Sequence, residues 1–266
     1  INSNIGDNGA VGASTALVIS GAGTVTLAPQ VSNTYTGGTT FNNLTINTTG
    51  AVLGQTVIPT GVGAGAIIGL TLNNAIVTMS APGQIAAATN VTLNGGASLT
   101  YTGANSVTGT ITINNPGGNA NPILTKADYS INGTTAVGNA TITGIANTTG
   151  LAVGQQVSGT GIPTGATIVS IVPNTSVTIS TPATAAGTVS LTYTGEILLG
   201  NNITATNDSF STFPTISSQI ELAGATRSIT TSGLSVNNLI MSGLIQSTGG
   251  GGSLTKLGTG SLTLSS

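Results

Sequence analysis

The feature of this sequence that most restricts its fold is an alternation of apolar and polar residues with a period of two. It recurs in TVTLA (24–28), NLTIN (43–47), VTLNG (91–95), TITIN (110–114), ATITG (140–144), SVTIS (176–180) and SLTLS (261–265). Because successive side chains of a strand point to opposite faces, this pattern is typical of strands with one buried face. No stretch of ten or more residues keeps a helical period without Gly or β-branched interruptions. We therefore predict an all-β protein.

Turn-forming pairs punctuate these segments. Asn94-Gly95 and Asn132-Gly133 supply the positive φ that tight turns need, as do Gly37-Gly38 and Gly117-Gly118. The composition argues against disorder, because the hydrophobic fraction is 38%, the mean hydropathy is +0.39 and the net charge is only −2. Aromatic residues make up 3% of the chain, so the core has to be built from Val, Ile, Leu, Ala and Thr.

The scarcity of charge excludes several classes of function. Charged residues are 3% of the chain, against roughly 25% in an ordinary globular protein, so the basic surface of a nucleic-acid-binding protein is missing. The absence of Cys excludes disulfides and thiolate metal sites. No apolar run approaches the roughly 18 residues of a membrane-spanning helix. We expect no metal, no cofactor and no enzymatic activity. A charge-poor chain is also expected to lack the lysines that usually protect sheet edges from pairing.

Internal repeats are the second guide to the architecture. Residues 47–93 align with 147–193 without a gap, with Gly54, Gln55 and Val57 facing Gly154, Gln155 and Val157. This indicates two copies of one β-module with similar backbones. We predict a β-solenoid or β-helix divided into a repeat segment (1–46), module copy 1 (47–103), connecting β rungs (104–146), module copy 2 (147–195) and a second repeat segment (196–266).

A further repeat links the two ends of the chain. LTKLGTGSLTL (254–264) aligns with LVISGAGTVTL (17–27), since 254 − 17 = 237. The chain therefore ends where its own beginning could follow. It is either a slice of a longer repetitive polypeptide or a subunit that another copy continues.

These residues carry a resemblance to a known family. The C-terminal LTKLGTGSLTLSS and the N-terminal GAGTVTL…NTYTGGTTFNNLTI are similar to the autotransporter-associated β-strand repeat of bacterial surface proteins. The resemblance implies a right-handed parallel β-solenoid displayed outside the cell. GLAVGQQVSGTGIPTGATI, within the second module copy, resembles a separate module of large bacterial surface and phage-tail-like proteins. The chain departs from the family because it contains no C-terminal membrane barrel.

Few residues offer chemistry. Glu196, Asp208 and Glu221, with Arg227 nearby, are spaced so that stacking could bring a catalytic carboxylate pair together. Solvated turn residues are the simpler interpretation. Asp7-Asn8-Gly9 is interpreted as a plain turn rather than a calcium loop.

The sequence therefore favours a structural extracellular protein that assembles head to tail into a filament or fibre on the bacterial surface. Its partners would be other copies of itself, with the cell envelope or glycans as further partners. The alternative is a surface-displayed adhesin passenger that binds a host, surface or glycan target. The predicted self-assembly residues are the apolar side chains at the two ends, namely Leu254, Leu257, Leu262, Leu264, Leu17, Val25 and Leu27.

Overall fold

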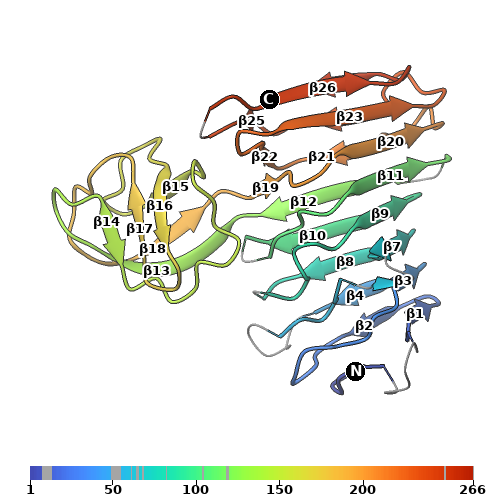
Figure 1. The fold of residues 1–266 in the computed structure, drawn as a ribbon, viewed down its shortest axis with the longest axis horizontal. Helices are drawn as coiled ribbons and strands as arrows, with labels where there is room; N and C mark the ends of the chain where they lie inside the picture. The colour runs from blue at the N-terminus through green and yellow to red at the C-terminus, as the bar shows by residue number, and fades with distance from the viewer. Residues whose placement is uncertain are drawn as a thin grey trace.

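A computed structural model describes residues 1–7, 14–48, 55–60, 62–63, 66–67, 69–81, 83–103, 105–117, 120–248 and 250–265. Within these residues the chain forms β-strands and no helix, which confirms the all-β prediction. Most strands belong to two parallel eight-stranded sheets that run the length of the molecule, and an antiparallel unit projects from one side (Figure 1).

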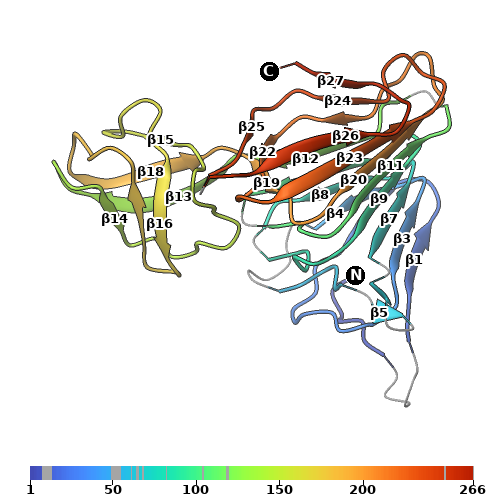
Figure 2. The same ribbon diagram turned by 45° about the horizontal axis from the view of Figure 1, so that its top comes forward.

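The chain alternates between the two long sheets. The first contains β1 (Leu17–Ser20), β3 (Thr39–Asn42), β7 (Leu70–Asn73), β9 (Val91–Asn94), β11 (Ile111–Asn115), β20 (Ile203–Asn207), β23 (Thr226–Ser232) and β26 (Ser253–Leu257), in that spatial order. The second contains β2 (Thr24–Thr26), β4 (Thr45–Asn47), β8 (Ile76–Met79), β10 (Ser98–Thr102), β12 (Ile123–Ala127), β21 (Thr215–Ile216), β24 (Leu239–Met241) and β27 (Leu262–Leu264). We call these sheets together the parallel stack. Each strand pairs with the strand that follows it in the same sheet, so the two ends of the chain lie at opposite ends of the stack (Figures 1 and 2).

Three smaller sheets complete the fold. A parallel third sheet contains β19 (Glu196–Leu198), β22 (Gln219–Glu221) and β25 (Ile245–Gln246). The antiparallel unit contains β13 (Tyr129–Thr135), β14 (Thr141–Thr143), β15 (Val157–Gly159), β16 (Ile168–Val172), β17 (Ser176–Ile179) and β18 (Gly187–Tyr193). We call it the inserted unit, because the chain leaves the stack after β12 and returns at β19. The pair β5 (Val62–Gly63) and β6 (Ala66–Ile67) is a short antiparallel hairpin.

The core follows from the period-two pattern. Parallel pairing keeps equivalent positions in line, so each inward-facing apolar residue stacks on the one in the next strand. One such row of the second sheet runs Val25, Ile46, Val77, Leu99, Leu124, Ile216, Met241 and Leu264. All but the two end members of this row are almost fully buried. The inserted unit has a separate hydrophobic cluster, so the molecule contains two cores.

The outer face of the first sheet carries rows of polar side chains. One row continues through Ser20, Asn42, Asn73, Asn94, Asn114, Thr206 and Ser232. Neighbouring asparagines in this row share amide hydrogen bonds; Asn73 donates to Asn42 at 2.6 Å and accepts from Asn94 at 2.7 Å. These bonds fix the strand register, because they form only when equivalent positions lie side by side.

The corners between the two long sheets require left-handed backbone. Asn43, Asn74 and Gly95 follow equivalent strands and have φ of 58°, 49° and 62°. Asn and Gly adopt this conformation most readily. At the third corner Gly avoids a clash, because a Cβ on Gly95 would collide with the Asn74 side-chain oxygen, which would have to move. The predicted Asn94-Gly95 turn is therefore confirmed. The predicted turn at Asn132-Gly133 is wrong, because both residues lie within β13 and pair with β18.

The two predicted module copies do not fold alike. Residues 70–93 place β7, β8 and β9 in the parallel stack, whereas 157–193 form antiparallel strands of the inserted unit. Val77 and Val177, aligned in the sequence, accordingly lie in different kinds of sheet. Gly54 lies outside the described residues, so its predicted equivalence to Gly154 stays a prediction.

The physical reason is that alternation fixes which face of a strand is buried but not which strand becomes its neighbour. β13 and β18, the first and last strands of the inserted unit, pair antiparallel from Tyr129↔Tyr193 to Thr135↔Gly187. This pairing keeps the second copy in the inserted unit and out of the parallel stack. The inserted unit therefore begins at β13, within the predicted connecting rungs 104–146. The predicted division between 146 and 147 is not a boundary between sheets.

Candidate functional site

The two ends of the parallel stack are the first candidate site. Among the described residues, β1 and β2 have no strand beyond them at one end, where Ile1 nevertheless donates to the Thr26 carbonyl of β2, and β26 and β27 have none at the other. The sequence repeat matches this arrangement, since both 17–27 and 254–264 give one strand to the first sheet and the next strand to the second. The repeated motif thus occupies both edges of the molecule.

The register differs from the sequence alignment by two residues. In the first sheet, the inward row that begins at Leu17 runs through Thr39, Leu70, Val91, Ile111, Ile203 and Ile229 and ends at Lys256. The alignment places Leu254 opposite Leu17 instead. A shift of two residues keeps every side chain on its face, so strand pairing tolerates it.

The predicted assembly residues fall into three groups. Leu17, Val25, Leu254 and Leu262 are partly buried and pack against the core. Leu27 is only 2% exposed, so it belongs to the interior and is not available to a partner. This corrects its assignment as a contact residue; it lies just after the short β2 and its amide is already bonded to Asn47. Leu257 and Leu264 are 47% and 58% exposed.

An exposed apolar residue also lies at the opposite end. Val18 on β1 is 60% exposed and heads an outer row that passes through threonines and ends at Leu257. Sequence reasoning selected Leu257 but not Val18. Only the pairing shows that it heads the same row as Leu257.

The expectation that the edges lack lysine is wrong. Lys256, one of only two lysines, lies on the terminal strand β26 in register with the buried Ile229. Its side chain is exposed, and its ammonium donates to the Gly258 carbonyl at 2.6 Å. A lysine at an inward position of an edge strand opposes uncontrolled pairing.

The opposite end of the stack carries a carboxylate. Asp7 accepts hydrogen bonds from the Thr15 amide, which precedes β1, and from the Thr36 amide and hydroxyl. These bonds, with the Thr36 hydroxyl contributing most, lower the pKa of Asp7 below its ordinary value. The predicted plain turn at Asp7-Asn8-Gly9 stays a prediction, because Asn8 and Gly9 lie outside the described residues.

A buried acidic pair is the second candidate site. Glu196 on β19 and Glu221 on β22 lie on the outer face of the third sheet, and each is only 1% exposed. Loops of the inserted unit cover this face: Gln246 donates to the Gly154 carbonyl, and Thr248 donates to that of Val153. Gln246 also donates to Glu196 Oε2 at 2.8 Å. We call this region the seam.

Lys126 joins the seam from β12. It is 5% exposed and its ammonium donates to the Gly150 carbonyl at 2.9 Å. Burial lowers the pKa of Lys126 to about 8, against the opposing effect of the Glu196 charge. Burial, with the Glu221 charge adding to it, raises the pKa of Glu196 to about 7. The seam therefore holds an ammonium and a carboxyl group, those of Lys126 and Glu196, whose charged forms are both disfavoured by desolvation.

The interpretation of these acids as solvated turn residues is wrong for two of the three. The topology brings Glu196 and Glu221 together because they lie on adjacent parallel strands of the third sheet. Asp208 lies elsewhere, where its Oδ1 accepts from the Leu234 amide. Arg227 belongs to β23 in the first sheet. The sequence signal that could have located the seam is that three of only eight charged residues, Lys126, Asp128 and Glu196, directly flank the inserted unit.

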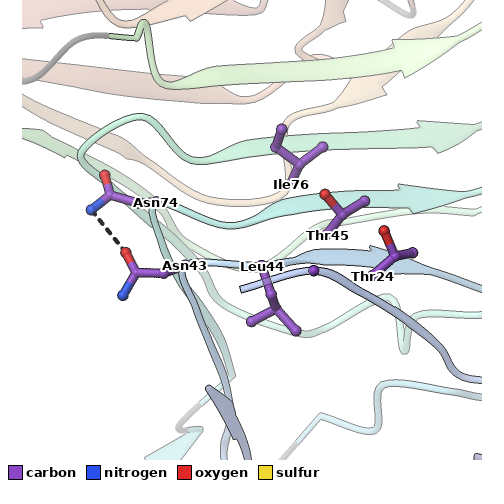
Figure 3. A pocket seen from close by; sticks show the side chains of 7 residues that line it. Thr24, Asn43, Leu44, Thr45, Asn74 and Ile76 are labelled. Atoms are coloured by element: carbon purple, nitrogen blue, oxygen red, sulfur yellow. Dashed lines mark hydrogen bonds between the residues drawn. The ribbon is translucent and has the colours of Figure 1, made fainter. Parts of the chain in front are cut away.

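A third feature is a shallow polar groove of about 270 Å³ beside the first strands of the second sheet. Figure 3 shows its lining, in which Thr24, Thr45 and Ile76 extend from neighbouring strands. Asn74 donates to Asn43 at 3.4 Å across its edge (Figure 3). The side chains that line this groove are uncharged.

Comparisons with known proteins do not identify the chain: no family model, no curated protein and no solved structure matches it. In the part of the chain that the structure describes, no helix is long and apolar enough to cross a membrane. The same residues contain no cluster of three or more acidic, His or Cys side chains suited to a metal ion.

Proposed function

We propose that the chain is a structural protein of the bacterial cell surface, in which the parallel stack is a β-solenoid that continues from one copy to the next. Support for the solenoid comes from the strict alternation of successive strands between the two long sheets. The localisation rests on the resemblance of the terminal motifs to surface-protein repeats.

One observation carries the assembly. Both long sheets end, at both ends of the stack, on strands with no further neighbour among the described residues, and the same sequence motif forms both edges. Unpaired N–H and C=O groups of an edge strand pair readily with another strand. In the proposed joint, β26 and β27 of one copy lie beside β1 and β2 of the next.

Apolar burial would contribute to such a joint but would not by itself offset the cost of association. It would cover the exposed parts of Leu257, Leu264 and Val18, and full burial of an aliphatic side chain is worth roughly 1.5–3 kcal/mol. Two ladders of backbone hydrogen bonds would add to this. Association itself costs roughly 4–15 kcal/mol. The contact is heterologous and does not close, so it would produce a filament.

The charges at the two ends of the stack favour head-to-tail pairing over pairing of two identical ends. Lys256 lies at one end of the stack and Asp7 at the other. The lysine opposes pairing of two identical C-terminal edges, because that would bring two ammonium groups together. Head-to-tail pairing instead brings unlike charges to the same joint. Low net charge, −2 per copy, limits repulsion between subunits.

The test compares three full-length proteins by sedimentation velocity, light scattering and negative-stain microscopy. The intact chain is expected to form fibres as its concentration rises, and the double variant L257K/L264K to remain monomeric. The matched control is Leu234→Lys, which adds a charge at a 75% exposed leucine of the β23–β24 loop and should assemble normally. An intact chain that stays monomeric at high concentration refutes the proposal, as does a double variant that forms the same fibres.

A second candidate function is an adhesin that binds a glycan. The polar groove of Figure 3 favours it, because its amide and hydroxyl groups are uncharged and could bond sugar hydroxyls. A glycan array probed with the intact chain and with Asn74→Leu tests this reading. Binding lost in the variant would favour the adhesin, and a blank array would count against it.

A further inference from the structure

The seam contains a cavity that neither the proposed assembly nor the groove explains. Its volume is about 390 Å³, within the range of small-molecule sites. Leu151, Val153 and Ile171 line it from the inserted unit, and Leu198 and Glu221 line it from the third sheet. Most of this wall is aliphatic, and Glu221 is its one ionisable side chain.

The carboxylate of Glu221 is held in place by the backbone. Its Oε1 accepts from the Ala223 amide at 2.5 Å and from the Thr248 amide at 2.9 Å. Its Oε2 is buried and has no hydrogen-bond partner. A buried carboxylate oxygen without a donor is costly, and nearly all such groups in folded proteins are paired. The seam thus orients this carboxylate and leaves half of its hydrogen-bonding capacity unused.

The balance of charge indicates the sign of the missing partner. Glu196 Oε1 is also buried without a partner, and the Lys126 charge acts on Glu196. Glu221 is the acid that lines the cavity, and an ionised carboxylate only accepts hydrogen bonds, which favours a cationic donor over an anion. A metal ion such as Ca²⁺ takes six to eight oxygen ligands. The largely aliphatic wall of the cavity supplies too few.

We propose that the seam cavity binds a primary ammonium group carried on a short aliphatic chain, which packs against Leu151, Val153 and Leu198. The ammonium donates to the Glu221 carboxylate, whose buried Oε2 turns toward the cavity to accept it. Such a group occurs both in free alkylamines and in lysine side chains. The ammonium would satisfy the orphaned oxygen through a charge-assisted hydrogen bond, which is stronger than a neutral one. This site is separate from the edge strands, so it stands whether or not the chain assembles.

The experiment titrates the full-length protein with three small probes and follows amide and methyl NMR signals of the cavity. The probes are n-butylammonium chloride, 1-butanol as its neutral counterpart, and calcium chloride. A capped Gly-Lys-Gly peptide then distinguishes a lysine side chain from a free amine. Butylammonium is expected to shift signals of Val153, Ile171 and Leu198 and to bind about tenfold or more tightly than butanol.

Two variants assign the contact. Glu221→Gln should weaken butylammonium about tenfold and leave butanol unchanged, because it removes the charge and keeps the shape. Val153→Trp should block every probe without touching the carboxylate, which keeps the proposal testable if the first variant folds poorly. Equal affinities for butylammonium and butanol overturn the proposal. So does unchanged butylammonium binding in Glu221→Gln, or a response to calcium alone.

Discussion

The buried acid pair predicts an unusual pH dependence of stability, which Glu196→Gln should abolish. Glu196 has a pKa of about 7 in the folded protein, against an ordinary value of 4.5. Because the folded pKa is the higher one, folding takes up a proton between these values. The stability from this group is complete below about pH 4.5 and is lost as the pH rises to about 7.

The size of the effect follows from the same two values. Each pKa unit corresponds to about 1.4 kcal/mol, so the loss between pH 4.5 and 7 amounts to about 3 kcal/mol. Glutamine imitates the protonated acid, and its carbonyl can still accept the Gln246 hydrogen bond. The variant should therefore equal the original chain at pH 4 and exceed its free energy of unfolding by about 3 kcal/mol at pH 8.

Urea unfolding at half-unit pH steps, followed by circular dichroism, measures this difference. Subtracting the two curves removes the contribution of every titrating group that does not interact with Glu196; Lys126 and Glu221 do interact with it. Asp208→Asn is the matched control, since it neutralises an acid remote from the seam. The reasoning is refuted if Glu196→Gln keeps the original slope between pH 4.5 and 7, or if it is the less stable protein at pH 8.

Three further predictions concern other parts of the structure. The pKa of Lys126 is lowered from 10.5 to about 8 in the folded protein, so the free energy of unfolding should rise between these two pH values. Lys126→Met should remove this rise in the same urea titrations. Asn73→Ala loses two amide hydrogen bonds of the outer row and should destabilise the chain by about 1–3 kcal/mol, whereas the exposed Asn201→Ala, remote from that row, should cost less than about 1 kcal/mol. Gly95→Ala forces a Cβ onto the Asn74 side chain at positive φ and should lower the melting temperature more than Gly138→Ala, which also has positive φ but open space around it.

The sequence by itself determined the local structure. Period-two alternation specified strands, and it specified which side chains of each strand are buried, as in Val91 and Leu93 of β9. The Asn94-Gly95 pair specified a corner, because few other residues adopt positive φ, whereas Asn132-Gly133 did not, since it lies within β13. The repeat at 17–27 and 254–264 also indicated that the two ends of the molecule are alike. The alternation and the turns depend on neighbours within a few residues, so a short segment of the sequence is enough to predict them.

Only the tertiary structure decided which strands become neighbours. The aligned segments 47–93 and 147–193 have similar alternation and turns, yet one joins the parallel stack and the other the inserted unit. Strand pairing also forms the seam. Glu196 and Glu221 come together because β19 pairs with β22, and Lys126 approaches Glu196 from β12. Pairing energies depend on contacts between residues far apart in the chain, and alternation is satisfied equally by several partners. In this protein the antiparallel pairing of β13 with β18 places the second segment in the inserted unit.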